Sequence, residues 1–330
     1  INPMKTLVAN FSKQLTEAIQ IGSKAKLTPS KTNISNVLIC GLGGSGIGGS
    51  IVAQLVAPSA TVPIDTSKGY FIPAYVNEKT LVIISSYSGN TEETLQCMEA
   101  AIQKNAKVVC VTSGGSVEKI AKEKGLDHII VPGGMPPRSC LGFSLVQLFF
   151  ILVSFNIIND SYKKDLEAAI KLIDAEEINI IAEATSIAKK IIGKLPVVYA
   201  TTYNEGIAIR LRQQLNENSK ILCWHHIIPE MNHNELVGWT EKNENLAVLF
   251  LLDKDEYSRN MARVEINKEV IKKYTSTIVD IHSKGNSAIE KAIYFIHLGD
   301  WLSVMLGESR GADLMEIKVI EHLKSALSKI

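Results

Sequence analysis

The chain has 330 residues, 46% of them hydrophobic, which is enough for a sizeable core in one or two domains. Lysine and arginine number 35 against 34 aspartates and glutamates, so the formal net charge is +1. This balance argues against a nucleic-acid-binding protein, and any anion site must be local. Because no charged-then-apolar leader and no CxxC spacing occur, we expect a cytoplasmic protein with reduced, buried cysteines.

Apolar, β-branched runs alternate with helix-like segments along most of the chain. A first helix is expected over residues 4–22. Strands are then predicted at 36–40, 60–66, 80–85, 106–112 and 128–131, with helices over 51–56, 92–104 and 115–124. The pattern restarts at Lys194, with strands at 197–201, 220–224, 246–252 and 276–282 and helices over 206–215, 255–271, 286–306 and 315–329. This alternation is typical of parallel, doubly wound α/β sheets.

One uncharged apolar run, from Cys140 to Ile158, is close to the minimum length of a membrane-spanning helix. Polar residues such as Ser144 and Gln147 interrupt it, and no second run of this kind occurs, so we predict a buried central helix and no membrane association. A charged helical stretch over 160–192 follows. We therefore predict two similar α/β domains, 1–155 and 156–330.

A glycine-rich loop, Gly41-Leu-Gly43-Gly44-Ser45-Gly46-Ile-Gly48-Gly49, links a predicted strand to a predicted helix. Glycines let the backbone approach a ligand closely, and the N–H groups at a helix start attract anions. The spacing Gly41-x-Gly43-x-x-Gly46, with Asp65 further on, also fits the dinucleotide fingerprint. This loop alone therefore leaves open a dehydrogenase, a phosphate site or a tight turn without a ligand.

A second loop, Ile84-Ser-Ser86-Tyr-Ser88-Gly-Asn-Thr91-Glu-Glu-Thr94, also follows an apolar strand and begins a helix. Ser86, Ser88 and Thr91 place three hydroxyls around a glycine turn, which forms a cage suited to a phosphate dianion. An ordinary capping box would account for one hydroxyl rather than three. A dinucleotide-dependent enzyme has no use for such a second loop.

The two loops resemble the sugar isomerase (SIS) fold. Three further segments narrow the resemblance: Pro136-Pro137-Arg138, Leu215-Asn216-Glu217-Asn218 and Pro229-Glu-Met-Asn232-His233-Asn234-Glu235. Together they are similar to the bifunctional phosphoglucose/phosphomannose isomerase family over residues 35–330. The resemblance implies a homodimer of tandem SIS-type domains, each a mostly parallel doubly wound sheet flanked by helices, that needs no metal or coenzyme.

The resemblance also implies a hexose phosphate substrate and a role for each matching residue. Glucose 6-phosphate, and mannose 6-phosphate, would be interconverted with fructose 6-phosphate. Glu217 would be the base, Arg138 would offset charge on the enediolate, and His233 would assist ring opening, reaching the site from the second subunit. Lys324 matches a catalytic lysine of the C-terminal helix. The phosphate is assigned to Gly44, Ser45, Ser86, Ser88 and Thr91.

Several alternatives stay open at this point. Ile317 stands where the family carries a hydroxyl or amide residue linked to substrate scope, so the use of mannose 6-phosphate is undecided. Arg138 could instead form a surface salt bridge, and Lys324 could be a helix-dipole partner. The histidines around His233 match no standard zinc motif, so we expect no metal. A non-catalytic sugar-phosphate sensor would keep the hydroxyl loops without needing Glu217.

Overall fold

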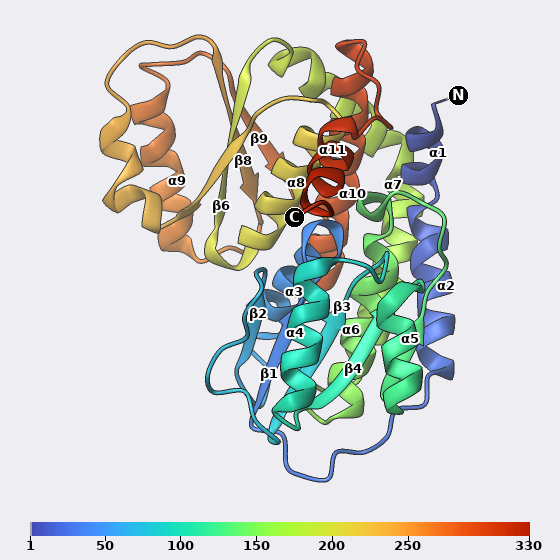
Figure 1. Cartoon of the computed structure of the whole chain (residues 1–330). Helices are drawn as coiled ribbons and strands as arrows, with labels where there is room; N and C mark the ends of the chain where they lie inside the picture. Colours follow the sequence, from blue (N-terminus) through green and yellow to red (C-terminus); the bar gives the residue numbers. More distant parts are fainter. Residues whose placement is uncertain (1) are drawn as a thin grey trace.

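The computed structural model describes residues 2–330, which form two parallel β-sheets flanked by helices (Figure 1). The strands of the first sheet are β1 (Asn36–Cys40), β2 (Ile64–Ser67), β3 (Thr80–Ser85), β4 (Lys107–Thr112) and β5 (Asp127–Ile130). Those of the second are β6 (Leu195–Thr201), β7 (Trp224–Ile228), β8 (Leu246–Leu252) and β9 (Ile278–His282). Their spatial orders are β2-β1-β3-β4-β5 and β7-β6-β8-β9, and every neighbouring pair is parallel. The predicted α/β class with parallel sheets is confirmed.

Both faces of the first sheet are buried, because side chains of a strand alternate between the two faces. In β3, Leu81 and Ile83 pack with α3 (Gly43–Val56) and α6 (Leu141–Ser154). Val82 and Ile84 point to the other face and pack with α4 (Glu92–Gln103) and α5 (Gly115–Lys124). A strand buried on both faces reads as a continuous apolar run, which explains why β3 was predicted with its observed bounds.

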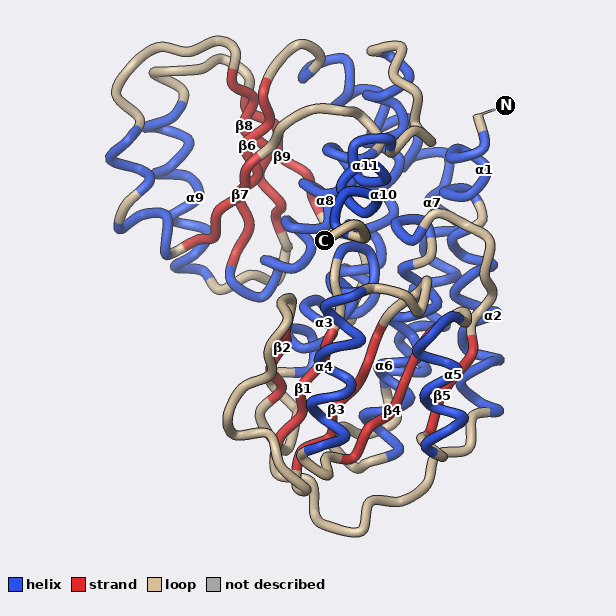
Figure 2. Tube along the Cα trace, viewed as in Figure 1, coloured by secondary structure: helices blue, strands red, loops and turns tan. Residues whose placement is uncertain are grey.

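The second sheet repeats this arrangement. Val198 of β6 and Leu249 of β8 pack with α8 (Glu205–Glu217) and α10 (Ala288–Ser309). Their neighbours Val197 and Val248 face α9 (Ser258–Ile271), which covers the outer side of this sheet (Figure 2). Helices therefore lie on both faces of each sheet, as expected for doubly wound sheets.

One hydrophobic core joins the inner faces of the two sheets. It also includes α7 (Tyr162–Ile191), which packs along α10, and the N-terminal helices α1 (Pro3–Ala9) and α2 (Phe11–Lys24). Helix α8 touches α3, and the Gly206 amide donates a hydrogen bond to Gln54 Oε1 at 2.7 Å. The helices that follow β1 and β6 are thus held in contact. The domain limits 1–155 and 156–330 stay a prediction.

The central apolar helix is a core element, as predicted. Most residues of α6 are buried. Gln147 Nε2 donates to the Ala18 carbonyl at 2.8 Å, Ser144 Oγ donates to the Leu141 carbonyl at 3.2 Å, and the Gly142 amide donates to Gln14 Oε1 at 2.8 Å. Among residues 2–330, no helix combines the length and apolarity that crossing a membrane requires.

The strand predicted at 220–224 is wrong. Strand β7 begins only at Trp224, and Lys220 has a left-handed backbone with φ of 57°. The segment before β7 completes the end of α8, because Asn216 Nδ2 donates to the Ile221 carbonyl at 2.8 Å. Ile221 packs against the main core, and this burial accounts for the apolar residue in the run. Smaller differences are a break at Asn10 in the helix predicted over 4–22 and a later start of β2.

The packing of α7 predicts that two of its isoleucines contribute very differently to the free energy of unfolding. Ile180 is fully buried, whereas Ile178 is 83% exposed. Ile180→Ala should lower the free energy of unfolding by about 2–5 kcal/mol through lost burial and a residual cavity. Ile178→Ala, the same change on the same helix, should alter it by no more than about 0.5 kcal/mol. Urea denaturation followed by circular dichroism measures both; equal losses would contradict this packing.

Candidate active site

The two hydroxyl-bearing loops meet at the carboxyl ends of neighbouring strands. The first follows β1 and the second follows β3, and the strand order reverses between these two strands. Such a switch point is where open α/β sheets bind their ligands. The loops are in direct contact, because the Tyr87 amide donates to Ser45 Oγ at 2.9 Å. The structure therefore brings the two predicted phosphate loops together.

The two loops together form a cradle around Ser45, Ser86, Ser88 and Thr91. The hydrogen bonds within this cradle leave donors free for an anion. Ser45 Oγ accepts from Tyr87, and Ser88 Oγ accepts from the Asn90 amide at 3.2 Å, so neither hydroxyl proton is used. Ser86 Oγ donates to Thr91 Oγ1 at 3.3 Å, which leaves the Thr91 proton available. Neither α3 nor α4 has a side chain that caps its first turn, so the first N–H groups of each helix stay open to an anion. The Ser45 amide, further along α3, donates to the Leu42 carbonyl at 3.1 Å. Thr91 is the N-cap residue of α4, but its hydroxyl does not act as the cap.

The cradle is connected to the segment that leads to Arg138. Tyr87 Oη donates to the Pro132 carbonyl at 2.8 Å and accepts from the Met135 amide at 3.3 Å. Gly44 approaches the same segment so closely that an added Cβ would lie 2.8 Å from the Pro137 carbonyl oxygen. Only a glycine fits this approach. The predicted residue Gly44 thus joins the first loop to the Arg138 segment.

Arg138 lies in the short 3-10 helix η1 (Pro137–Ser139) and is 2% exposed. Its Nε donates to Asn218 Oδ1 at 2.7 Å, and its Nη2 donates to the Leu314 carbonyl at 2.6 Å. Nη1 lies 3.5 Å from Glu217 Oε2. Burial lowers the pKa of the Arg138 guanidinium, and the Glu217 charge opposes this effect. The alternative of a surface salt bridge is wrong, because this cation is buried and paired.

Glu217, the last residue of α8, lines a cavity of about 260 Å³. Its side chain is 28% exposed, so a ligand can reach it. Lys220 lies in the same cavity, and its Nζ donates to the main-chain carbonyls of Glu217, at 2.6 Å, and of Glu316. Burial, and next the charge of Arg138, lower the pKa of Lys220. The other residues that line this cavity are Asn216, Glu316, Ile317, Val319 and Ile320.

The structure does not connect two predicted residues to this cluster. His233 is exposed at the end of η3 (Glu230–His233), and Lys324 lies on α11 (Lys318–Leu327), which has no buried residue. No hydrogen bond or ion pair formed by the described residues joins either side chain to Glu217 or Arg138. Their catalytic roles stay predictions.

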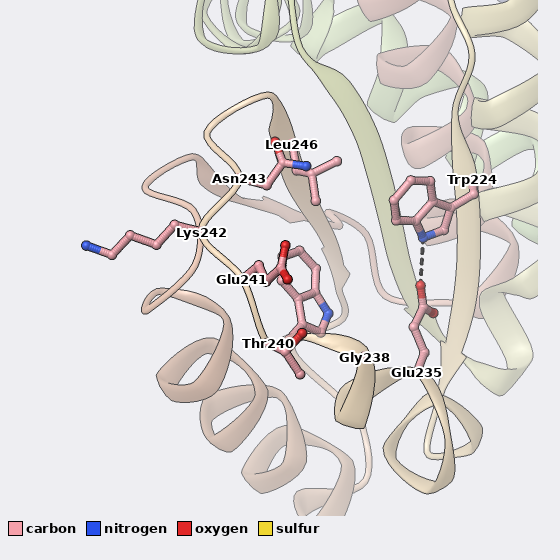
Figure 3. Close-up of a pocket in the computed structure, with 9 residues that line it drawn as sticks. Trp224, Glu235, Gly238, Thr240, Glu241, Lys242, Asn243 and Leu246 are labelled. Carbon is pink, nitrogen blue, oxygen red and sulfur yellow. Dashed lines mark hydrogen bonds between the residues drawn. The ribbon is translucent and has the colours of Figure 1, made fainter.

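A second cavity, of about 340 Å³, lies beside β7 (Figure 3). On one side of it, Trp224 Nε1 donates to Glu235 Oε1 at 2.7 Å, and Lys242 points outward. None of the predicted site residues lines this cavity, so it is separate from the Arg138–Glu217 cluster.

In the part of the chain that is described, no group of three or more metal-ligating side chains is arranged to hold an ion.

Comparison with known proteins identifies the family of this chain. Residues 180–327 match the model of the bacterial phospho-glucose isomerase C-terminal SIS domain. The chain is 36% identical to a bifunctional phosphoglucose/phosphomannose isomerase of Caldicellulosiruptor bescii, over 98% of both chains, and 37% identical to that of Aquifex aeolicus, over 92% of both. It is also 32% identical to a D-glucosamine-6-phosphate 4-epimerase of Sulfolobus acidocaldarius, over 74% of this chain and 76% of the relative.

Among solved structures, the C-terminal domain of a glucosamine-fructose-6-phosphate aminotransferase of Francisella tularensis superposes with a TM-score of 0.78 at 16% identity. The match covers 95% of this chain and 98% of that one, and at such low identity it shows the fold alone. The two relatives that match over nearly the whole chain show more than the fold: this protein belongs to the family of bifunctional phosphoglucose/phosphomannose isomerases.

Proposed function

We propose that this chain interconverts glucose 6-phosphate, and also mannose 6-phosphate, with fructose 6-phosphate through an enediolate. The observation that carries the proposal is the pair formed by buried Arg138 and accessible Glu217, connected through Gly44 to a cradle of free hydroxyl and amide donors. Family membership favours this aldose–ketose isomerisation over a dinucleotide-dependent dehydrogenase. We expect the reaction to take place in the cytoplasm.

The proposed chemistry needs a fixed phosphate, a base and a cation. The cradle holds the phosphate through Ser45, Ser88 and Thr91, whose protons are free. Glu217 takes the proton from C2 of the open-chain aldose and returns it to C1. Arg138 Nη1 offsets the negative charge that develops on the enediolate oxygens.

Glucose 6-phosphate and mannose 6-phosphate differ only at C2, so both give the same enediolate once that proton is removed. Return of the proton to either face of C2 then decides which aldose forms. Ile317 lines the Glu217 cavity and gives it an apolar wall. We therefore include mannose 6-phosphate as a substrate whose rate must be measured separately from that of glucose 6-phosphate.

One relative supports a second candidate reaction. The relative of Sulfolobus acidocaldarius that is 32% identical to this chain over 247 aligned residues is a D-glucosamine-6-phosphate 4-epimerase. Incubation of the protein with glucosamine 6-phosphate, followed by chromatography of the products, tests this reaction. Conversion of the amino sugar without turnover of fructose 6-phosphate would overturn the isomerase proposal.

Glu217→Gln removes the base but keeps the size and shape of the side chain. We expect the turnover of fructose 6-phosphate to fall roughly 100- to 10,000-fold, as for the loss of a general base, while calorimetry shows nearly unchanged binding of fructose 6-phosphate. Glu205→Gln, at the first residue of the same helix, is the control and should stay active. Full activity of Glu217→Gln would mean that another group moves the proton.

Ser88→Ala tests the phosphate cradle. A hydrogen bond to a charged group contributes about 1.5–3 kcal/mol, so its loss should raise KM for fructose 6-phosphate about 10- to 100-fold and change kcat little. Ser116→Ala is the control, because the Ser116 hydroxyl already donates to Asn90 Oδ1 at 3.1 Å. Steady-state kinetics measures both variants. An unchanged KM in Ser88→Ala would exclude this hydroxyl from phosphate binding.

A homodimer in which His233 acts on the neighbouring subunit predicts complementation. When inactive Glu217→Gln and His233→Ala subunits are mixed equally and allowed to exchange, half of the dimers combine the two variants and contain one intact site. Roughly a quarter of the wild-type activity should therefore return. If His233 acts within its own subunit, the mixture stays inactive. Analytical ultracentrifugation of each variant shows whether the dimer itself is retained.

A further inference from the structure

Two of the three guanidinium nitrogens of Arg138 are held by neutral acceptors. Nε donates to the Asn218 side chain at 2.7 Å and Nη2 donates to the Leu314 carbonyl at 2.6 Å. The contact of Nη1 with Glu217, at 3.5 Å, is long for a hydrogen bond between charged groups. Arg138 and Glu217 thus face each other without forming a two-pronged salt bridge.

The orientation of the Asn218 amide is fixed from its other side. Asn218 is fully buried, and its Nδ2 donates to Ser303 Oγ at 2.9 Å. Ser303 Oγ in turn donates to the Asp300 carbonyl at 2.7 Å, so it can only accept from Asn218. A flipped amide would place its NH₂ group against the Nε–H of Arg138, donor against donor. Asn218 Oδ1 must therefore point at Arg138.

The main chain of Arg138 is anchored to the same region of α10. Arg210 Nη2 donates to the Arg138 carbonyl at 2.7 Å and to Asp300 Oδ2 at 2.9 Å. Gln214 Nε2 donates to Asp300 Oδ1 at 2.9 Å. Helix α10 therefore supports the backbone of Arg138 through Arg210 and its side chain through Asn218, whose Oδ1 accepts from Nε.

We propose that Asn218 is a positioning residue that holds the Arg138 guanidinium so that Nη1 faces the substrate oxygens instead of closing a bidentate salt bridge with Glu217. A guanidinium released from Asn218 can rotate about its stem and pair with the carboxylate through two parallel hydrogen bonds. Such a pair would occupy the base and remove the cation from the enediolate. The inference rests on the proposed isomerase function and adds a residue to it.

Ser219→Ala is a matched control for Asn218→Ala. Ser219 is also fully buried, and its Oγ donates to the Ser303 carbonyl at 2.6 Å. Each variant removes one buried hydrogen bond between the end of α8 and α10, but only Asn218 contacts Arg138. Asn218→Ala should lose more thermal stability than Ser219→Ala, because it also leaves the buried Nε–H of Arg138 without its acceptor. A difference in catalysis between them then reports on Arg138 rather than on packing.

The experiment measures fructose 6-phosphate isomerisation and inhibition by 5-phosphoarabinonate, whose carboxylate resembles the enediolate. Asn218→Ala should lower kcat about 10- to 100-fold with KM changed less than about 3-fold, and should weaken the inhibitor by a similar factor. Inhibition by inorganic phosphate should stay the same. Ser219→Ala should leave all three quantities unchanged.

A double-mutant cycle with Arg138→Lys separates positioning from a general structural effect. Lysine has no counterpart of the Nε–H, so in that background Asn218→Ala should change kcat less than about 2-fold. If Asn218→Ala does not fold, Ser303→Ala leaves the amide in place but removes its acceptor, and should lower kcat in the same direction by about 3- to 10-fold.

Equal kcat for Asn218→Ala and Ser219→Ala, or full additivity with Arg138→Lys, would overturn the positioning role while the isomerase stands. A wild-type protein that turns over no hexose phosphate would instead overturn the proposed function itself.

Discussion

The buried charge of Arg138 is the constraint on which the arrangement of the site depends. An unpaired ion in a protein interior costs several kcal/mol, so every nitrogen of this guanidinium must find an acceptor. The acceptors come from two remote parts of the chain: the end of α8, which supplies Glu217 and Asn218, and the Leu314 carbonyl, which meets η1 from beyond α10. The need to give this guanidinium its hydrogen-bond acceptors therefore fixes how the segments that follow the two sheets meet.

The sheet topology explains why the two hydroxyl-bearing loops lie beside this cation. Strands β1 and β3 are neighbours, and the loops after them face the same edge of the sheet. Gly44 then lets the first loop approach the backbone that carries Arg138, while Tyr87 of the second loop holds the segment just before it. These loops and the cation are thus joined by a close main-chain approach at Gly44 and by the two hydrogen bonds of the Tyr87 hydroxyl.

Strands buried on both faces and loops with repeated glycine and hydroxyl residues could be predicted from the sequence, because their signals are local. The strand predicted at 220–224 was wrong, since a short apolar run does not tell whether it pairs in a sheet or packs beneath a helix end. The supports of Arg138 could not be placed, because Asn218 and Leu314 are distant in sequence. One feature of the sequence did indicate a buried polar cluster near α10. Asp300 interrupts this apolar helix, and a buried carboxylate requires a partner such as Arg210.

The order of these segments along the chain has a consequence for biosynthesis. A ribosome makes Arg138 first, then Glu217 and Asn218, and the Leu314 carbonyl only after the whole of α10. A nascent chain that stops within α10 holds a guanidinium with one of its acceptors missing, in a core whose inner face is still uncovered. Translation itself thus delays assembly of the complete cluster until the residues around Leu314 have been made.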